Sequence, residues 1–432
     1  MPCLRYNTKK CPSCKPRRID KAHRDFILDD GARAWSGRRL PPCCGIYYVA
    51  GNWANDLTVN SILFLNEYGS LNGAEKSLLA VLPFVVDAGL HVSVVAPVVG
   101  PFANEVQRRG AKFVPWNSDF AALSLVDKRK ILAEILEKQK PTMVHANSLS
   151  MGRLSGPVLD EYGIPGTTHI RDIVRVSAAA ACDLNKHRLI IAVSDATRRF
   201  HIEQGIDGKK IITLYNGVDL NEFFPREQTG FLHEEFAIPK NRPIIGCIGQ
   251  IGPRKGQDIL LEAVVSILVK YDAMLMIVGQ RFSEKEESVQ FERKLHDFIN
   301  NSGLGSRVVF CGIRNDVSRI FSELTILVHA ARQEPLGRVL LEASACGCPI
   351  VATDVGGTGE ILTNCDRLIP SNDPFAIKQR IIELLESPDL RARLGTEARK
   401  QAEQKFSASV SATKFLRLLL DNGNIPPCRD TI

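Results

Sequence analysis

The sequence lacks any apolar run of the ~18 residues that a membrane-spanning helix needs. Its first residues, MPCLRYNTKKCPSCKPRR, lack the apolar stretch of a secretory signal. Aromatic residues make up only 7% of the chain, and they are not interleaved with Lys and Arg as in a nucleic-acid groove. We therefore expect a cytoplasmic protein with no nucleic-acid partner. The rest of the composition is typical of a globular protein, and 432 residues are enough for two domains.

The first 58 residues differ from the rest of the chain in charge and in cysteine content. They hold 11 Lys and Arg against 5 Asp, whereas the later residues hold 44 basic against 43 acidic side chains. Five of the 12 cysteines lie among the first 44 residues. Cys11 and Cys14 have half of a zinc-ribbon spacing, but Cys43 and Cys44 are not a matching second half. We expect residues 1–58 to be a disordered leader, or an over-long reading of the start, rather than a metal site.

From Ser61 on, short apolar runs alternate with amphipathic stretches, the pattern of βαβ units with a parallel sheet. The first series predicts strands at 61–65, 91–96, 112–115, 142–146, 166–169 and 189–193, with helices at 74–88, 102–109 and 126–138. The second predicts strands at 244–248, 273–278, 308–310, 326–328 and 349–353, with helices at 257–270, 284–300 and 335–346.

Two consecutive α/β series predict an α/β fold with two Rossmann-like domains facing an interdomain cleft. We place the first domain at 59–222 and the second at 223–405. An amphipathic segment at 406–424 is expected to cross back to the first domain, the alternative being an ordinary packing helix of the second. Ligands of such sheets bind outside the carboxyl ends of the strands.

The segment Glu334-Pro-Leu-Gly-Arg-Val-Leu-Leu-Glu342 follows an apolar strand and is predicted to open a helix. The unpaired amides and positive dipole end of such a helix suit a pyrophosphate. Eight helical residues rise by roughly 12 Å, comparable with the span from a hexose past a diphosphate to a ribose. A carboxylate can accept hydrogen bonds from two vicinal hydroxyls. The alternative is a surface helix with two solvated glutamates.

A glycine-rich loop, Gly246-Cys-Ile-Gly249-Gln250-Ile-Gly252-Pro-Arg254-Lys255-Gly256, leaves another buried strand and enters a helix. Its two cations can neutralise a departing nucleoside diphosphate. A glycine-rich turn alone is weak evidence, because many α/β loops contain one. Followed by the two glutamates, it is much stronger.

In the first half, Gly69-Ser-Leu-Asn-Gly73 occupies the first strand-to-helix loop, where it presents amides to a phosphate or is an ordinary turn. His145 and His169 each end an apolar strand, at edges where sites form. A histidine at a strand end is more often structural than functional.

Together these motifs resemble the family-four retaining glycosyltransferases of the GT-B fold (glycosyl transferases group 1), over about residues 61–420. The resemblance rests on E-x7-E at Glu334 and Glu342, the GxI-x3-KG loop at 249–256, NGVD at 216–219 and FCGIRND at 310–316. All four occur in the family's order. The set is specific to the family, but not to a substrate.

The resemblance implies a role for each matching residue on the donor side. Glu334 holds hydroxyls of the transferred sugar, Glu342 holds those of the ribose, and Lys255 neutralises the diphosphate. Amides of Gly337 and Arg338 also meet the diphosphate.

Other implied residues lie in loops of both domains. Gly249 belongs to the donor-binding loop, while Gly69 and Gly73 face the diphosphate from the first domain. His169 contacts the donor sugar near its C6 hydroxyl. Arg171 and His145 are lesser candidates, on the acceptor side.

One departure is Gln250, which stands where the family usually has Arg. A neutral amide cannot supply that charge, and Arg254 is our candidate for compensation. No Asp-x-Asp metal motif stands at a strand end, so we expect no metal cofactor and activity in excess chelator. The family pattern suggests front-face substitution, in which the leaving diphosphate helps to deprotonate the acceptor.

The sequence therefore predicts a transferase that moves a hexosyl-type sugar from a nucleoside diphosphate to a polysaccharide, lipid-linked or small-molecule acceptor. A non-catalytic sugar-nucleotide-binding protein with a decayed site and a sugar-nucleotide epimerase are the alternatives. Lipid-linked acceptors would place the protein at the inner face of the membrane, through peripheral contact. Neither the nucleotide base nor the acceptor follows from the motifs.

Overall fold

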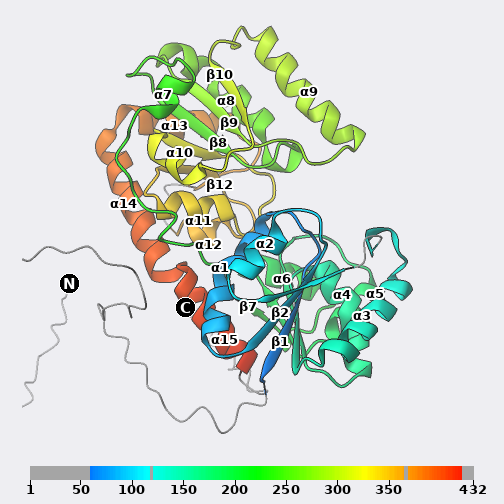
Figure 1. The fold of residues 1–432 in the computed structure, drawn as a ribbon. Helices are drawn as coiled ribbons and strands as arrows, with labels where there is room; N and C mark the ends of the chain where they lie inside the picture. Colours follow the sequence, from blue (N-terminus) through cyan, green and yellow to red (C-terminus); the bar gives the residue numbers. More distant parts are fainter. Residues whose placement is uncertain (1–58, 117–119, 364–367, 421–432) are drawn as a thin grey trace, which may run out of the picture. The chain divides into compact units, whose positions relative to one another are not determined.

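The computed structural model describes residues 59–116, 120–363 and 368–420. The predictions for the leader at 1–58, and for residues 421–424 of the last helix, lie outside these residues. Within the described ranges, parallel strands form two sheets that follow each other along the chain (Figure 1).

The first sheet has seven strands in the order β3-β2-β1-β4-β5-β6-β7, and every neighbouring pair is parallel. The strands are β1 (Ser61–Leu65), β2 (His91–Ala96), β3 (Lys112–Pro115), β4 (Met143–Ala146), β5 (Gly166–Ile170), β6 (Leu189–Ala192) and β7 (Ile211–Thr213). The connecting helices are α1 (Gly73–Asp87), α2 (Phe102–Arg108), α3 (Leu125–Gln139), α4 (Leu149–Glu161), α5 (Ala178–Asn185) and α6 (Asp195–Glu203), with a 3-10 turn at Phe120–Ala122.

The second sheet has six parallel strands in the order β10-β9-β8-β11-β12-β13. The strands are β8 (Ile244–Ile248), β9 (Met274–Val278), β10 (Val308–Gly312), β11 (Ile326–His329), β12 (Ile350–Thr353) and β13 (Leu368–Ile369). The helices are α7 (Phe231–Glu235), α8 (Gln257–Lys270), α9 (Glu286–Asn301), α10 (Val317–Glu323), α11 (Arg338–Ala345), α12 (Thr358–Ile361), α13 (Pro374–Glu386) and α14 (Pro388–Lys405), with a 3-10 turn at Pro253–Lys255.

Both sheets share the strand order 3-2-1-4-5-6 of the doubly wound Rossmann plan. The order reverses beside β1 in the first sheet and beside β8 in the second. Ligands bind at such switch points. A ligand site is therefore expected in the loops that follow β1, β4, β8 and β11. The predicted α/β fold with two Rossmann-like units is confirmed, while the boundary at 222/223 stays a prediction.

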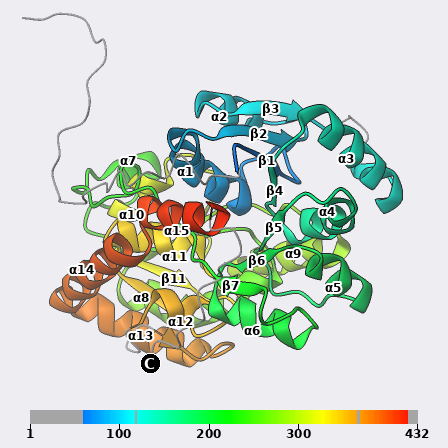
Figure 2. The same cartoon turned by 90° about the horizontal axis from the view of Figure 1, so that it is seen from below.

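The chain returns to the first sheet through α15 (Ala408–Leu420). Val218, after β7, pairs with the turn between α14 and α15, because its amide donates to Phe406 O at 2.8 Å and its carbonyl accepts from Ala408 N at 2.8 Å. Phe415 and Leu419 of α15 are buried in the same apolar cluster as residues of β1 and α1. Figures 1 and 2 both show α15 beside α1.

Three helices of the first half, α4 to α6, are not among the predicted elements. The sequence of α4 contains two glycines and a proline, which normally weaken a helix. Here Gly152 lies against the Thr168 side chain of β5, where an added Cβ would come within 2.3 Å of Thr168 Oγ1. Gly152 therefore allows α4 to approach the sheet closely.

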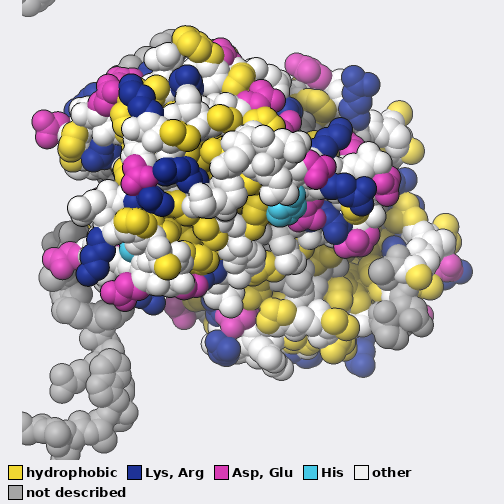
Figure 3. All heavy atoms as spheres, turned by 90° about the horizontal axis from the view of Figure 1, so that it is seen from above, with side chains coloured by type: hydrophobic (Ala, Val, Ile, Leu, Met, Phe, Trp, Pro, Cys, Tyr) yellow, Lys and Arg dark blue, Asp and Glu magenta, His cyan; other side chains and the backbone are white. Residues whose placement is uncertain are grey.

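No helix in the described part of the chain combines the length and the apolar character that a membrane span requires. On the face shown in Figure 3, Lys and Arg side chains are interspersed with Asp and Glu.

Candidate active site

The carboxylate of Glu334 is the centre of a buried charged cluster. Glu334 lies in the loop between β11 and α11 and is only 6% exposed. Its Oε2 accepts hydrogen bonds from Lys255 Nζ and from His329 Nε2, the latter at 2.9 Å. Arg254 Nη1 lies 3.9 Å from Oε1. Residues almost eighty positions apart thus meet where β8 and β11, two neighbouring strands, end.

This cluster keeps Glu334 ionised. Burial alone would raise the pKa of Glu334, but the charge of Lys255, the hydrogen bond from His329 and the charge of Arg254 hold it well below its usual range. Burial also lowers the pKa of His329, against the opposing effect of Glu334. The site therefore offers a carboxylate and cations side by side at neutral pH.

Sequence reasoning missed His329. It ends the apolar strand β11, as His145 and His169 end strands of the first sheet. The same rule, a polar residue at the carboxyl end of a buried strand, would have found it.

Helix α11 begins at Arg338, so the prediction of a helix from residue 335 is wrong. Gly337 precedes it with φ 105°, a conformation that L side chains rarely adopt. The span from Glu334 to Glu342 is consequently part loop, and the helical rise expected between them does not apply. The free amides of the first turn nevertheless follow Gly337, as expected for an anion site.

The glycine-rich loop is fixed against the Glu334 loop by main-chain and side-chain contacts. Arg254 Nη1 donates to Gln333 O at 3.2 Å, and Arg332 N donates to Arg254 O at 2.8 Å. The carbonyl of Gln250, whose loop begins at Gly249, accepts from Gln257 Nε2 at 2.9 Å. The structure therefore brings Arg254 and Lys255 to Glu334.

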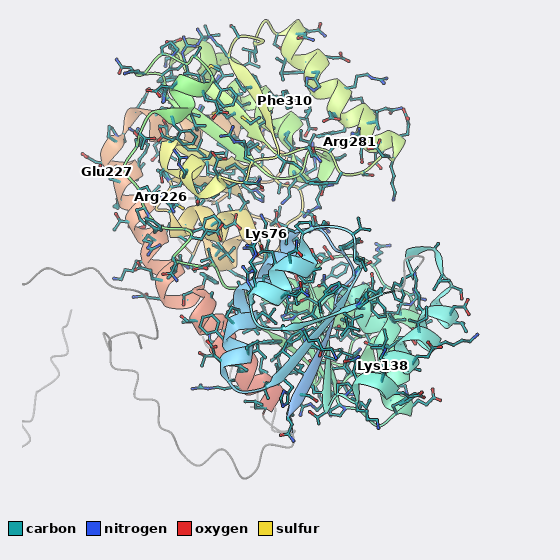
Figure 4. All side chains as sticks on the ribbon, viewed as in Figure 1. Lys76, Lys138, Arg226, Glu227, Arg281 and Phe310 are labelled. Carbon is teal, nitrogen blue, oxygen red and sulfur yellow. The ribbon has the colours of Figure 1, made fainter. Side chains whose placement is uncertain are left out.

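Glu342 is buried on α11 and paired within its own helix. Its Oε1 accepts from Arg338 Nε at 2.7 Å, and Arg338 Nη1 also reaches Ser77 Oγ of α1, at 3.2 Å. A cavity of about 860 Å³ adjoins the pair and is lined on its other side by α1, including Lys76 (labelled in Figure 4). Its lining also includes Glu222, where burial and the charge of Glu342 raise the pKa of that carboxyl.

The β1–α1 loop places its two glycines in different surroundings. A Cβ on Gly69 would come within 2.0 Å of Val99 O, so this position lets the loop pass closely beside the one after β2. Nothing lies within 4 Å of a Cβ at Gly73, the first residue of α1. The packing of the two loops thus explains a glycine at position 69. Packing does not require a glycine at position 73, where the helix N-terminus faces open space.

The two histidines of the first half form one hydrogen-bonded pair. His145 Nε2 lies 2.9 Å from His169 Nδ1, and His145 Nδ1 lies 2.7 Å from Thr167 Oγ1. Phe415 of α15 packs on both rings, with centroid distances of 4.9 Å and 5.7 Å. Burial, followed by the charge of Arg171, lowers the pKa of each histidine well below its usual value, so both are neutral at pH 7.

Arg171 joins the ends of β4 and β5 to the linker after β7. Its Nη1 donates to Asn216 Oδ1 at 2.7 Å, and its Nη2 donates to Asn147 Oδ1 at 2.7 Å. Asn147 Nδ2 in turn donates to Asn66 Oδ1 at 2.8 Å, and Asn66 Nδ2 to Glu75 Oε1 at 3.2 Å. The polar chain runs from the linker to the first turn of α1.

Burial shifts the pKa of both ionisable members of this polar chain. It lowers the pKa of Arg171 to about 10 and raises the pKa of Glu75. Sequence reasoning named Arg171 but missed Asn66 and Asn147, which directly follow β1 and β4.

Among the described residues, no three His, Cys, Asp or Glu side chains are grouped so that they could hold a metal ion.

Models of known protein families match both halves of this chain. The model of glycosyl transferases group 1 matches residues 228–401, and that of glycosyltransferase family 4 matches residues 71–222. The two matches follow each other without overlap and together cover most of both sheets. The chain belongs to the family-4 glycosyltransferases of group 1.

Two curated relatives each match about half of this chain. N-acetyl-alpha-D-glucosaminyl L-malate synthase of Bacillus anthracis is 27% identical over 215 residues, 49% of this chain and 54% of that protein. A GDP-mannose-dependent monoacylated alpha-(1-6)-phosphatidylinositol monomannoside mannosyltransferase of Corynebacterium glutamicum is 30% identical over 217 residues, 48% and 55% of the two chains. The chain thus matches little more than half the length of these relatives.

Solved structures support the fold of the family. The crystal structure of Anabaena HepE in complex with UDP and glucose aligns with a TM-score of 0.74 at 22% identity, covering 84% of this chain and 99% of that one. This similarity confirms the GT-B fold of two Rossmann-like units. The roles of individual site residues stay predictions.

Proposed function

We propose that this family-4 protein is a retaining glycosyltransferase that moves a hexosyl-type sugar from a nucleoside diphosphate to an acceptor hydroxyl, without a metal ion. The observation that carries the proposal is the Glu334 carboxylate, which is buried between Lys255 and His329 at a sheet switch point. Such a carboxylate accepts hydrogen bonds from sugar hydroxyls, while the adjoining cations face the diphosphate.

On the donor side, Glu334 holds the transferred sugar and Glu342 holds the ribose. Lys255, Arg254 and the first amides of α11 neutralise the diphosphate, whose negative charge grows as the glycosidic bond breaks. Gln250 stands where the family usually has Arg, and Arg254 supplies the positive charge in its place. Arg254 Nη1 lies 3.9 Å from Glu334 Oε1, close enough to act at the same centre.

On the sugar side, His169 contacts the transferred sugar as a neutral ring. His145 holds its Nδ1, which fixes the ring orientation and leaves Nε2 for the sugar. Both rings of the His145–His169 pair are neutral, so they bring no charge to the sugar. We propose front-face substitution, in which the acceptor enters on the side where the diphosphate leaves.

The names of similar proteins limit the donors worth testing. The Anabaena structure contains UDP and glucose, and the Corynebacterium protein is named for GDP-mannose. We propose a UDP- or GDP-linked hexose as donor, and a glycan, a lipid-linked sugar or a small molecule as acceptor. We also propose a cytoplasmic location, in contact with the inner face of the membrane if the acceptor is lipid-linked.

The test is a panel of UDP-, GDP- and ADP-sugars, each with glycan, lipid and small-molecule acceptors, in the presence of excess EDTA. We expect release of nucleoside diphosphate only when an acceptor is present, and a product whose anomeric configuration by NMR equals that of the donor. Binding of a nucleotide sugar without release in any combination would point to a non-catalytic binding protein. Isomerised nucleotide sugar without release would point to an epimerase, and an inverted product would contradict retention.

A further inference from the structure

The loop that contains Glu334 is held on both sides by residues of the first half. On one side, Gln333 Nε2 donates to Ile173 O, after β5, at 2.9 Å. On the other, Ser194 Oγ donates to the carbonyl of Pro335. Glu334 itself is held by its own half, because Gly357 N donates to its carbonyl at 2.9 Å.

The N-terminus of α6 is capped by a side chain from the second half. Glu360 of α12 accepts from Asp195 N at 2.7 Å and from Ala196 N at 2.8 Å, one bond to each carboxylate oxygen. Ser194 Oγ accepts from the third free amide, Thr197 N, at 3.0 Å. Without Glu360, two of the first three amides of α6 would lose these acceptors.

These contacts form one junction, made of Ser194 and the start of α6 on one side and of Pro335 and Glu360 on the other. Ser194 and Thr197 are fully buried, so the centre of the junction is shielded from bulk solvent. A carboxylate at a helix N-terminus also interacts favourably with the helix dipole. The junction lies one residue from Glu334 in sequence, and through Gly357 it also contacts the Glu334 main chain.

We propose that Ser194 and Glu360 are positioning residues, which fix the Glu334 loop in its sugar-binding conformation when the two halves meet. This inference rests on the proposed function, since it assigns Glu334 to the sugar. When the junction opens, Pro335 and Gln333 lose their partners, and the loop around Glu334 is no longer held by the first half. Closure of the protein and completion of the sugar pocket are then one event.

The junction should affect binding of the sugar more than binding of the nucleotide. Glu342 and Lys255 belong to the second half and are not among the junction residues, so we do not expect binding of a bare nucleoside diphosphate to depend on it strongly. Binding of the whole donor does, because the sugar needs Glu334 in place. The ratio of the affinity for the nucleotide sugar to that for the nucleoside diphosphate therefore indicates whether the junction is intact.

The experiment compares Glu360→Ala with the wild-type full-length protein. Calorimetry measures Kd for UDP-glucose and UDP, or for GDP-mannose and GDP, whichever pair the panel selects. We expect about tenfold weaker binding of the nucleotide sugar, unchanged binding of the nucleotide within twofold, and about tenfold lower kcat. Small-angle X-ray scattering of the ligand-free variant should show a larger radius of gyration.

A matched control is Asp373→Ala. Asp373 caps α13 within the second half, accepting from Ala376 N at 2.9 Å, so its loss costs a helix cap without touching the junction. We expect a similar decrease in Tm but a wild-type affinity ratio and radius of gyration. If Glu360→Ala does not fold, Glu360→Gln and Ser194→Ala replace it, with smaller shifts in the same direction.

Two results would overturn the inference. One is a Glu360→Ala protein with the wild-type affinity ratio, kcat and radius of gyration. The other is an equal loss of affinity for nucleotide and nucleotide sugar, which would indicate general damage. A wild-type protein that binds no nucleotide sugar would instead contradict the proposed function, while the scattering comparison would still test the junction.

Discussion

The two halves of the protein share a strand order but place different chemistry at their switch points. In the second half, a buried carboxylate is surrounded by Lys255, Arg254 and His329. In the first half, two neutral histidines share a hydrogen bond under an aromatic ring. The difference follows the proposed reaction, because the diphosphate brings charge to the second half, while the first half meets sugar hydroxyls.

The largest effect should come from removing the charge of the second half's carboxylate. Glu334→Gln keeps the shape of the side chain but leaves Lys255 without its anionic partner. We expect kcat/KM to fall by roughly 10²–10³, as for removal of a preorganised electrostatic contact, with little change in nucleotide affinity. Glu342→Gln is the matched variant, for which nucleotide affinity should fall instead. A Glu334→Gln enzyme with near wild-type turnover would contradict the comparison.

The next effect concerns the aromatic cover of the first half's histidines. Phe415→Ala should cost about 3–5 kcal/mol of stability through the cavity it leaves. Because Phe415 packs on both His145 and His169, we also expect roughly tenfold slower transfer. Phe321→Ala, in the core of the second half, is a control with a similarly buried ring. Equal rates for the two variants, compared at a temperature where both are folded, would show that Phe415 has no role beyond packing.

A smaller effect should follow from loss of Arg254, the more exposed of the two cations beside Glu334. Arg254→Ala should weaken nucleoside diphosphate binding by about tenfold and leave nucleoside binding unchanged, because only the phosphates need the charge. Arg393→Ala, which breaks an exposed pair with Glu397 on α14, is the control. If Arg254→Ala had unchanged diphosphate affinity and turnover, the proposal that Arg254 compensates for the neutral Gln250 would be wrong.

No effect on turnover at neutral pH is expected from replacing His187, a buried histidine outside the site. Burial lowers the pKa of His187 to about 4, while the unfolded chain has its ordinary value near 6.5. Between these values the unfolded state binds the proton, so stability falls as pH falls, by ~1.4 kcal/mol per pH unit for this one residue.

Replacing His187 removes this proton uptake. His187→Gln retains a donor for Gly152 O, which lies 2.8 Å from His187 Nε2. Urea unfolding at pH 6.5, 5.5 and 4.5 should show a shallower loss of stability than in the wild type, with equal activity at pH 7. A slope as steep as that of the wild type would contradict the direction of the pKa shift.

Much of the fold could be predicted because strands that are buried on both faces consist of short apolar runs in the sequence. Every predicted strand occurs, and β1, β2, β3 and β8 have the predicted bounds. The unpredicted β7 and β13 have only three and two residues, too few for a pattern. Helix α11 begins late because Gly337 adopts a positive φ, which residue types alone do not reveal.

The candidate site was predicted residue by residue, but not as a set of contacts. Motif spacing selected Glu334 and Lys255, yet it could not show that they form an ion pair across 79 positions. It also left out His329, Asn66 and Asn147, although each stands at or directly after the end of a buried strand. Phe415 gave no signal at all, because it is one apolar residue of an amphipathic helix.

By itself, the sequence determined the family, the two parallel sheets and the residue types of the donor site, since these depend on local periodicity and on motif spacing. The tertiary structure decided which charges meet at Glu334, which ring covers His145 and His169, and how Glu360 of one half caps a helix of the other. The physical reason is that ionisation and capping depend on neighbours in space, and these neighbours come from strands and helices far apart in the chain.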